Sequence, residues 1–486
     1  MSLQTSESPP VPRWARALDV LCLLLVVIAG IVAMSGGFRQ RLAGVRVAVT
    51  SPYWPLVWAL VIAVVRHIAA PQSPIYREFP TRIGGWWQLP QVRSAGRAIV
   101  WTRPAILLVG YLSVFMIGYV NGRAPLRHFN NELLNLPVRW DAGWYLNIVT
   151  DGYQFVPDDG ERQQNIVFFP AYPMLVRLVG RLFGGHMTGY VTAGMAVSLA
   201  AFFAALIYLY LFTRDTLGED KARFAQWLIA SYPFALFFGA IYTESLFLLA
   251  AIGAFYHATK QQFGAAALWG LAVGLTKLNG AVLSVPLFII AISPWIPSSL
   301  VRRPGDLPLL AEAPPMRDRR RAVKAVLTAA APGLGLLLYA LFIWEMTGDP
   351  LAWGKGHIAW GRTYEPITTL VANQYSFIAN AGLSGYLASP GYDVLNTLAA
   401  LFVLATVWPV ARRMGLAYAV LILIVTLPPI FNGGWLSAGR FSSVLFPTFV
   451  WLADVVPTAH RPGWIGGFAA LQAFNATLFY TWRPLI

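Results

Sequence analysis

The sequence has few charged residues and a single cysteine. Only 12% of its 486 residues are charged, while 57% are hydrophobic. Soluble domains carry roughly 25% charged residues, and one buried core cannot hold this excess of apolar side chains. The lone Cys22 excludes an intramolecular disulfide and a cysteine-based metal cluster. The shortage of charge therefore predicts an integral membrane protein whose surface is largely covered by a lipid bilayer.

Two further absences exclude other classes of protein. No glycine-rich nucleotide-binding motif is present, which argues against direct use of a nucleotide sugar. The net charge of +15 does not indicate a nucleic-acid partner, because the basic residues lie between apolar runs and not along one face. The six histidines are scattered without the spacing of metal ligands.

Long apolar runs predict an all-α polytopic membrane protein with about 11–13 transmembrane helices, since ~20 apolar helical residues cross a bilayer. One run, 263–293, is too long for a single helix and is interrupted by Thr276, Lys277, Asn279 and Gly280. We expect two half-length helices that meet at this break. The other predicted spans are 17–34, 52–68, 102–120, 187–213, 222–239, 241–259, 323–346, 393–411, 415–431, 437–456 and 462–480.

The arginines between these runs predict how the helices are oriented. Cytoplasmic loops carry an excess of Lys and Arg, and the loops 69–101 and 294–322 carry four and six arginines. With the N-terminus in the cytoplasm, only the basic loop 35–49 violates the rule. Two large loops, 121–186 and 347–392, then face outward, and 294–322 is predicted to be a flexible cytoplasmic linker.

The first outward loop holds the strongest candidate for chemistry. Asp141 follows an arginine and is surrounded by Trp140, Trp144 and Tyr145. Its carboxylate is able to take a proton from an acceptor hydroxyl, and the aromatic rings are able to stack on a sugar or on lipid. The structural alternative is an interfacial aromatic belt in which Asp141 caps a helix.

This loop resembles the signature loop of the PIG-V family, the GPI mannosyltransferase 2 type of GT-C glycosyltransferases. The resemblance is carried by Arg139-Trp140-Asp141-Ala142, Gly152-Tyr153, Asn165 and Phe168-Phe169-Pro170 with Pro173. It implies a GT-C-type fold with outward catalytic loops and a polyprenyl- or dolichyl-phosphate mannose donor. It also implies that Asp141 is the catalytic base and that Asn165 contributes to substrate binding.

The resemblance has two departures. Trp144 stands where eukaryotic members tend to have histidine, so the chain looks more like a bacterial branch, and a GPI acceptor is not expected. The two spans within 1–101 also look like an addition. We therefore predict an N-terminal region, 1–101, with a cytoplasmic tail, two extra spans and a basic loop, followed by a catalytic core, 102–486.

Three cations are candidates to hold the donor phosphate. Arg440 lies at the outer mouth of the span 437–456, and its structural alternative is snorkelling to the interface. Lys277 lies at the predicted helix break, where an ionisable residue is a functional candidate, although it is also compatible with an ordinary helix end. Arg139 is the third, and it is also suited to orienting Asp141.

Three other polar residues are weaker candidates for substrate binding. Glu244 lies in a short outward turn and suits either an acceptor sugar or a helix cap. Asn279 lies in the helix break. His357 belongs to the mixed aromatic and polar loop 347–392, which suits a sugar-binding lid or an interfacial amphipathic helix.

Together these features predict a multi-pass mannosyltransferase of the plasma membrane with its active site on the outer face. It would move mannose, with inversion, from a polyprenyl-phosphate carrier to a glycan or glycolipid acceptor. We expect no metal cofactor, although Asp158 and Asp159 are able to bind one. The alternatives are a transferase for another lipid-linked sugar, a transporter or flippase, and a scaffold with a degenerate loop.

Overall fold

A computed structural model describes most of the chain and divides it into two compact units. Unit 1 contains residues 1–93 and 177–193, and unit 2 contains residues 94–176 and 194–486. The predicted division at residue 101 into an addition and a catalytic core stays a prediction. The described residues are 12–35, 38–42, 45–49, 51–70, 74, 84–120, 126–157, 162–293, 319–388 and 391–485.

Unit 1 is built around a helical hairpin. The helices α1 (Arg13–Ser35) and α2 (Tyr53–Ala69) pack together, as the first two predicted spans require. Asp19 and Arg66 form a fully buried ion pair between them, 2.7 Å from Oδ1 to Nε. The loop between the helices forms an antiparallel pair of strands, β1 (Phe38–Leu42) and β2 (Val45–Val49), which was not predicted.

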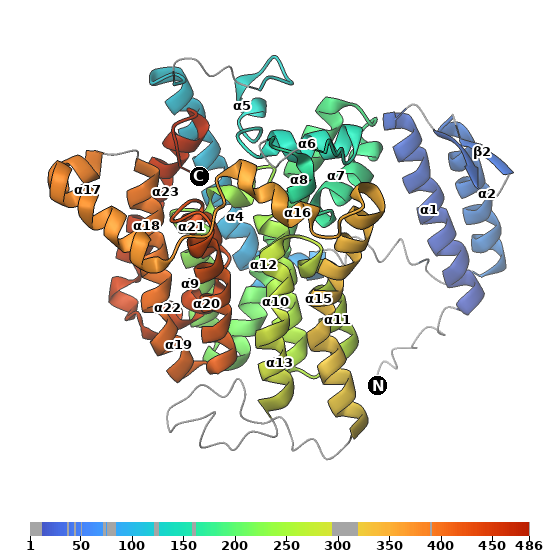
Figure 1. Ribbon diagram of the computed structural model, residues 1–486. Helices are drawn as coiled ribbons and strands as arrows, with labels where there is room; N and C mark the ends of the chain where they lie inside the picture. Colours follow the sequence, from blue (N-terminus) through green and yellow to red (C-terminus); the bar gives the residue numbers. More distant parts are fainter. Residues whose placement is uncertain are drawn as a thin grey trace, which may run out of the picture. The chain divides into compact units, whose positions relative to one another are not determined.

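Unit 2 is a bundle of helices whose upper end in Figure 1 carries the loops. Three helices continue from one unit into the other along the chain: α4, α7 and α8. The helices are α4 (Pro90–Met116), α5 (Glu132–Asn135), α6 (Ala142–Asp151), η1 (Asn165–Val167), α7 (Ala171–Leu182), α8 (Met187–Leu217), α9 (Glu219–Ser231), η2 (Ala235–Gly239), α10 (Glu244–Thr259), α11 (Phe263–Gly274), α12 (Leu278–Ala281), α13 (Ser284–Ile292), α15 (Arg319–Thr347), α16 (Ala352–Lys355), η5 (Gly356–Trp360), α17 (Ile367–Ala388), α18 (Gly391–Ala405), α19 (Val407–Arg413), α20 (Leu416–Phe431), α21 (Ala438–Ser443), α22 (Phe446–Val455), η6 (Thr458–His460) and α23 (Arg461–Tyr480).

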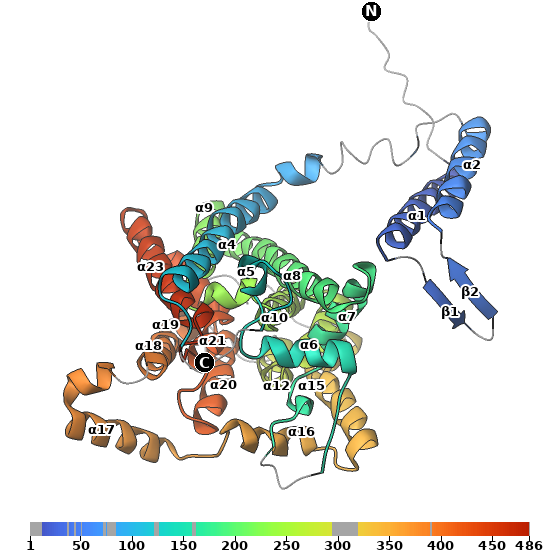
Figure 2. The same ribbon diagram turned by 90° about the horizontal axis from the view of Figure 1, so that it is seen from above.

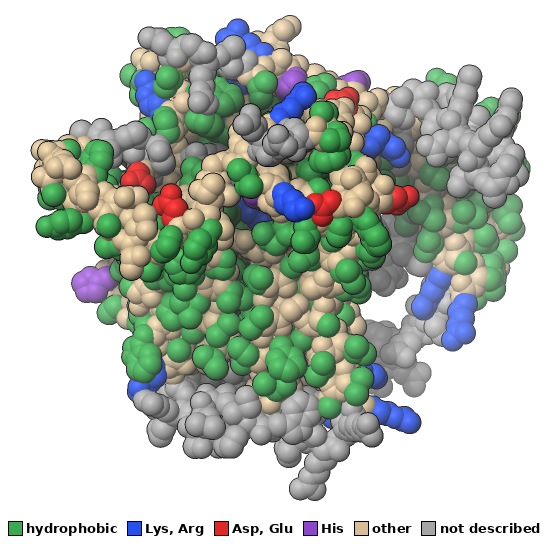
Figure 3. Space-filling model, viewed as in Figure 1, with side chains coloured by type: hydrophobic (Ala, Val, Ile, Leu, Met, Phe, Trp, Pro, Cys, Tyr) green, Lys and Arg blue, Asp and Glu red, His purple; other side chains and the backbone are tan. Residues whose placement is uncertain are grey.

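The predicted all-α membrane fold is confirmed. Within the described part of the chain, four helices are long and apolar enough to cross a membrane, and five shorter apolar helices accompany them. Figure 3 shows hydrophobic side chains covering the helices below the level of α16, with charged side chains at and above that level and Lys or Arg side chains at the lower edge. Large apolar side chains such as Trp101 and Phe115 are 71% and 80% exposed, as lipid-facing residues would be. The number of spans and their orientation stay predictions.

Several predicted spans differ from the helices in their boundaries. The predicted span 102–120 begins twelve residues earlier, because α4 starts at Pro90 inside the predicted basic loop. The predicted span 222–239 is α9 followed by the short helix η2. The helix is interrupted at Pro233, because proline lacks the backbone N–H that helix continuation requires. The predicted outward loop 347–392 contains the 22-residue helix α17. Most of the predicted linker, 294–318, lies outside the described residues.

The predicted break in 263–293 is confirmed. The segment forms α11, α12 and α13, and the chain leaves the helical path at Thr276 and Lys277. The freed carbonyl of Leu275 accepts the backbone N–H of Ala171 at 2.9 Å, so the unwound backbone is satisfied within the protein. Seen from above in Figure 2, α12 lies next to α6, and Figure 1 places α12 lower in the bundle than α6. The break therefore places Lys277, which directly precedes α12, below the segment that contains α6.

Candidate active site

In the turn before α6, the side chains of Arg139 and Asp141 point in different directions. Trp140 has a φ of +54°, a left-handed conformation that is strained for a residue with a side chain. Its indole N–H donates to the carbonyl of Phe479 at 3.1 Å. The Tyr242 hydroxyl accepts the backbone N–H of Asp141 at 3.1 Å and donates to the Arg139 carbonyl at 3.2 Å. These bonds hold the turn in its strained form.

The Asp141 side chain does not cap the helix that it precedes. It occupies the N-cap position of α6 but makes no capping hydrogen bond. Its Oδ2 instead accepts a hydrogen bond from Nη1 of Arg440 at 2.6 Å. Both side chains remain slightly accessible, at 20% for Asp141 and 10% for Arg440. The structural alternative of a helix cap is therefore not what the geometry shows.

A second carboxylate and a second cation complete the cluster. Glu244, at the start of α10, is 1% exposed and accepts a hydrogen bond from Lys277 Nζ at 2.7 Å. The same Oε1 lies 3.3 Å from Nε of Arg440. Lys277 also lies over the ring of Phe441, 4.5 Å from its centre. Four charged side chains from distant parts of the chain thus form one continuous group, which we call the charged cluster: Asp141, Glu244, Lys277 and Arg440.

The charged cluster borders a cavity of about 540 Å³, which we call the first cavity. Aromatic side chains and the break between α11 and α12 form its walls. Among the predicted site residues, seven line it; Glu244 lies behind the wall, against Lys277. The seven are Trp140, Asp141, Tyr145, Lys277, Asn279, His357 and Arg440.

The segment after α15 contributes two basic residues to the first cavity. Arg362 donates from Nη1 to the Leu436 carbonyl at 3.1 Å and from Nη2 to the Ser437 hydroxyl at 3.3 Å. Burial lowers the pKa of its guanidinium to about 10, so it remains a cation at neutral pH. Burial also lowers the pKa of the His357 imidazole, so this ring is neutral there.

The five ionisable side chains at this end leave an excess of positive charge. Arg362, Lys277 and Arg440 are cations, and Asp141 and Glu244 are carboxylates, so the group carries a net charge of one positive. Arg440 offers five N–H donors, and the bond to Asp141 is its single hydrogen bond within the described residues. The cavity is thus suited to an anionic group held beside a carboxylate.

Arg139 does not reach the first cavity. Its guanidinium is fully buried and donates to Glu132 at 2.7 Å, and its other N–H groups bond the carbonyls of Asn135 and Tyr480. Its neighbour Tyr119 also donates to Glu132. We therefore correct the prediction that Arg139 contacts substrate, because all of its donor groups are already engaged within the fold.

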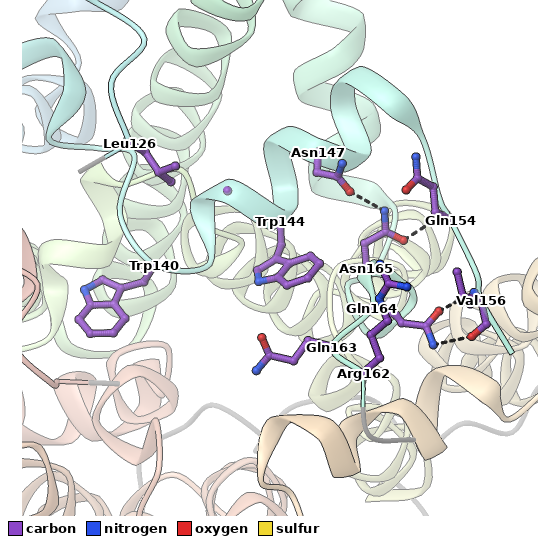
Figure 4. A pocket seen from close by; sticks show the side chains of 11 residues that line it. Leu126, Trp140, Trp144, Asn147, Gln154, Val156, Arg162, Gln163, Gln164 and Asn165 are labelled. Atoms are coloured by element: carbon purple, nitrogen blue, oxygen red, sulfur yellow. Dashed lines mark hydrogen bonds between the residues drawn. The ribbon is translucent and has the colours of Figure 1, made fainter. Parts of the chain in front are cut away.

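Trp144 and Asn165 line a separate cavity of about 450 Å³, which we call the second cavity (Figure 4). Trp140 borders both cavities. The amide of Asn165 accepts the backbone N–H of Gln154 and donates to Asn147, each within 3.0 Å. The predicted binding residues therefore divide between two spaces.

Sequence reasoning missed the roles of Arg362 and Tyr242. Arg362 stood in a loop with several equally plausible polar residues. Tyr242 directly precedes the Thr243-Glu244 turn, and its ring also lies 5.5 Å below the guanidinium carbon of Arg440. No sequence pattern joins this tyrosine to a loop a hundred residues earlier, and only the folded chain shows the contact.

The structure provides no candidate metal centre among the residues it describes. Within those residues, no group of three or more His, Cys, Asp or Glu side chains is placed to hold a metal ion. Asp158 and Asp159, the alternative acidic pair, lie outside them. Independence from metal therefore stays a prediction.

Comparison with known proteins supports the resemblance found in the outward loop. The model of the family described as Mannosyltransferase (PIG-V) matches residues 124–291. The match covers the loop with Asp141, as well as Glu244 and Lys277, and ends before Arg440. The resemblance to this family is thereby confirmed over about a third of the chain, and the assignment to a bacterial branch stays a prediction. No curated protein matches the chain.

The chain is also similar to solved structures of an oligosaccharyltransferase. One is the archaeal oligosaccharyltransferase AglB from Archaeoglobus fulgidus with an inhibitory peptide and a dolichol-phosphate, at 12% identity and a TM-score of 0.39, covering 78% of this chain and 55% of that one. Another is the Archaeoglobus fulgidus enzyme tethered to an acceptor peptide, at 11% identity and a TM-score of 0.38, covering 82% and 56%. The chain spans about half the length of the structures it matches.

Proposed function

We propose, from the premise of this family match, that the protein is a membrane glycosyltransferase of GT-C type that transfers mannose from a polyprenyl-phosphate carrier. The observation that carries the proposal is the charged cluster, in which a candidate base and two cations from distant segments meet at one cavity. We propose mannose as the transferred sugar because the matched family is described as a mannosyltransferase. The proposed acceptor is a glycan or glycolipid of the cell envelope.

The charge of the first cavity fits the leaving group. A polyprenyl-phosphate sugar is a phosphodiester with one negative charge, and the ionisable side chains here carry one net positive charge. As the sugar–oxygen bond breaks, the phosphate gains a further negative charge. Arg440 and Lys277 are placed to stabilise that charge, because both side chains line the cavity and are largely buried.

Asp141 is proposed to act as the general base. The acceptor hydroxyl gives its proton to the Asp141 carboxylate as its oxygen attacks the anomeric carbon of the mannose. The bond between that carbon and the phosphate oxygen breaks, the lipid phosphate leaves, and the configuration inverts. Arg440 bonds one carboxylate oxygen, Oδ2, which leaves Oδ1 to receive the proton.

We further propose that the protein is a multi-pass protein of the plasma membrane with the first cavity at its outer face. Single cysteines introduced at Arg127 and Arg321 in a Cys22→Ala background test this on intact cells. Both positions are exposed. A membrane-impermeant thiol reagent should label the cysteine at 127 and spare the one at 321. The reverse pattern would overturn the orientation.

The decisive test of the function is Asp141→Asn. Asparagine keeps the shape and is still able to cap a helix, but it cannot take a proton from a hydroxyl. We expect transfer to fall about 10²–10⁴-fold, measured with purified protein, a polyprenyl-phosphate mannose and a membrane extract that supplies acceptors. The matched control is Asp220→Asn, a change of the same kind at a side chain that is 76% exposed.

The alternatives make different predictions in the same experiment. A transferase for another sugar would show no turnover of the mannose donor but would use a different polyprenyl-phosphate sugar, and it would still depend on Asp141. A transporter would move the lipid-linked sugar without forming a product. Near-normal transfer by a folded Asp141→Asn would contradict the base role assigned to this residue.

A further inference from the structure

We propose that the second cavity binds a neutral saccharide unit of the acceptor, and that it sets which acceptors are used. This inference rests on the proposed function for the transfer step, but not for the binding itself. The cavity lies in the outward loop region, beside the helix that Asp141 precedes. Its eleven lining residues are Leu126, Trp140, Gly143, Trp144, Asn147, Gln154, Val156, Arg162, Gln163, Gln164 and Asn165.

The chemistry of the second cavity differs from that of the first. Among the described residues no carboxylate lines it, and Arg162, whose side chain is exposed, is the one charged residue of that lining. The remaining polar groups are amides and indoles. Amides donate and accept at once, which matches the hydroxyl groups of a neutral sugar, whereas the first cavity is built from charges that suit a phosphate.

Two buried amides hold the frame of the cavity. Gln164 is 8% exposed, and its side chain bonds both the N–H and the carbonyl of Val156, at 2.8 and 2.9 Å. Asn165 is 3% exposed and bonds Gln154 N–H, Gly152 O and Asn147. Figure 4 shows the bonds of Gln164 to Val156 and those of Asn165 to Gln154 and Asn147 along one wall. Such preorganisation lowers the cost of ordering the site when a ligand binds.

The binding groups project from this frame. The side chains of Gln154 and Arg162 are exposed and make no hydrogen bond within the described residues. Gln163 is exposed and donates one long bond, 3.4 Å, to the Ala359 carbonyl. These three side chains thus retain donors and acceptors for a ligand, while the two buried amides beneath them are already satisfied.

Trp144 forms the wall between the two cavities. Its ring stacks on Phe168 at an interplanar angle of 16° and meets the edge of Trp360, with ring centres 6.1 and 5.1 Å away. Both of those neighbours line the first cavity, whereas Trp144 lines the second. An indole held in this way offers a flat apolar surface to the C–H face of a sugar ring, and its N–H makes no hydrogen bond within the described residues.

The distance from this cavity to Asp141 suits an acceptor. Asp141 precedes α6, and Gly143, Trp144 and Asn147 of the same helix line the second cavity. A rise of 1.5 Å per residue places Asn147 ~9 Å along the helix axis from Asp141. A saccharide bound here therefore extends its next sugar unit past Trp140, which borders both cavities, toward the base.

The test is the double variant Gln154→Ala/Gln163→Ala, with Gln88→Ala as the matched control at an exposed glutamine of unit 1. The probe is a neutral mannose trisaccharide with a short alkyl chain. We expect its KM as acceptor to rise about 10-fold, equivalent to about 1.4 kcal/mol, because the ligand loses its hydrogen bonds to two neutral side chains. The KM for the polyprenyl-phosphate mannose should change less than twofold. Trp144→Phe, which replaces the indole by a smaller aromatic ring without an N–H, should give a smaller rise.

Binding of the same trisaccharide by saturation-transfer NMR separates the two proposals. Binding to the wild type that is lost in the double variant, without any transfer of mannose, supports the saccharide site and overturns the proposed function. Transfer with an unchanged acceptor KM in the folded double variant overturns the saccharide site and leaves the function standing. An acidic trisaccharide that binds at least as tightly as the neutral one overturns the inference that the ligand is neutral.

Discussion

Arg139 and Asp141, on either side of Trp140 in the sequence, each belong to a buried arginine–carboxylate pair, and the two pairs differ in how many hydrogen-bond donors of the arginine are engaged. Arg139 pairs with Glu132, and every nitrogen of its guanidinium donates to a group of the fold. Arg440 pairs with Asp141, makes a single hydrogen bond within the described residues and borders a cavity. Both arginines are buried cations beside carboxylates, so burial and pairing alone do not identify a functional site.

What separates the two groups is the number of donors left over. A guanidinium with all its donors satisfied has nothing to offer a ligand and contributes to folding alone. A guanidinium with spare donors at a cavity wall is held in place by the fold and remains available to an anion. This distinction predicts that changes on the two sides of Trp140 affect different properties of the protein.

The largest effect is expected for Arg440→Ala. Losing one preorganised donor to a developing anion typically reduces turnover 10²–10³-fold, and we expect a loss of this size in mannose transfer. Arg440→Lys should retain part of the activity, because the charge stays and the planar fork is lost. Arg223→Ala, at an arginine 54% exposed, is the control. Wild-type kinetics in folded Arg440→Ala would remove the difference between the two arginines.

Arg139→Met, which removes the other buried arginine, should reduce the free energy of unfolding and leave turnover nearly unchanged. It leaves Glu132 without its main partner, and breaking a buried ion pair costs about 3 kcal/mol or more. Thermal unfolding in detergent should show a clearly lower Tm, while kcat per folded molecule stays within about twofold of wild type. A kcat that fell as far as in Arg440→Ala would restore Arg139 to the substrate site.

Glu244→Gln should have a smaller effect and a distinctive signature. The change removes one negative charge, so the cavity attracts the donor phosphate at least as strongly, but Lys277 loses the carboxylate that holds it at 2.7 Å. We expect kcat to fall about tenfold while the donor KM stays the same or decreases. An increase in donor KM with an unchanged kcat would mean that Glu244 contacts the substrate directly.

The smallest effect concerns pH. Burial lowers the pKa of His357, so its folded pKa lies below the unfolded value of about 6.5. The unfolded state then binds more protons, and the contribution of the neutral ring to stability is complete above pH 6.5 and declines as the pH falls below it. The Tm of wild type should therefore drop by up to about 2 °C more than that of His357→Gln between pH 7.5 and 5.5. Parallel curves would contradict the burial of this ring.

The sequence predicted the fold class and much of the cluster, for definite physical reasons. Apolar runs and the polar interruption at Lys277 are local patterns, and the break between α11 and α12 follows them. Asp141, Lys277 and Arg440 stood out because charges are rare in this chain. Arg139 was misjudged because its direction depends on the left-handed backbone of Trp140, which no neighbouring residue type indicates. The separation of Trp144 from the first cavity likewise depends on rings from other segments.

The glycines around the helix break bear on how this protein can be redesigned. A methyl group on Gly274 would lie 2.0 Å from the Pro332 carbonyl oxygen, and one on Gly280 would lie 1.9 Å from that of Val273. The walls around Lys277 are therefore formed by closely packed backbone. Side-chain substitutions at these glycines cannot change the shape of this region unless the backbone, including that of α15, moves. The second cavity is bordered instead by exposed glutamines. Under the proposed function, acceptor choice can therefore vary through the exposed side chains of the second cavity, while the backbone around Lys277 is constrained to change little.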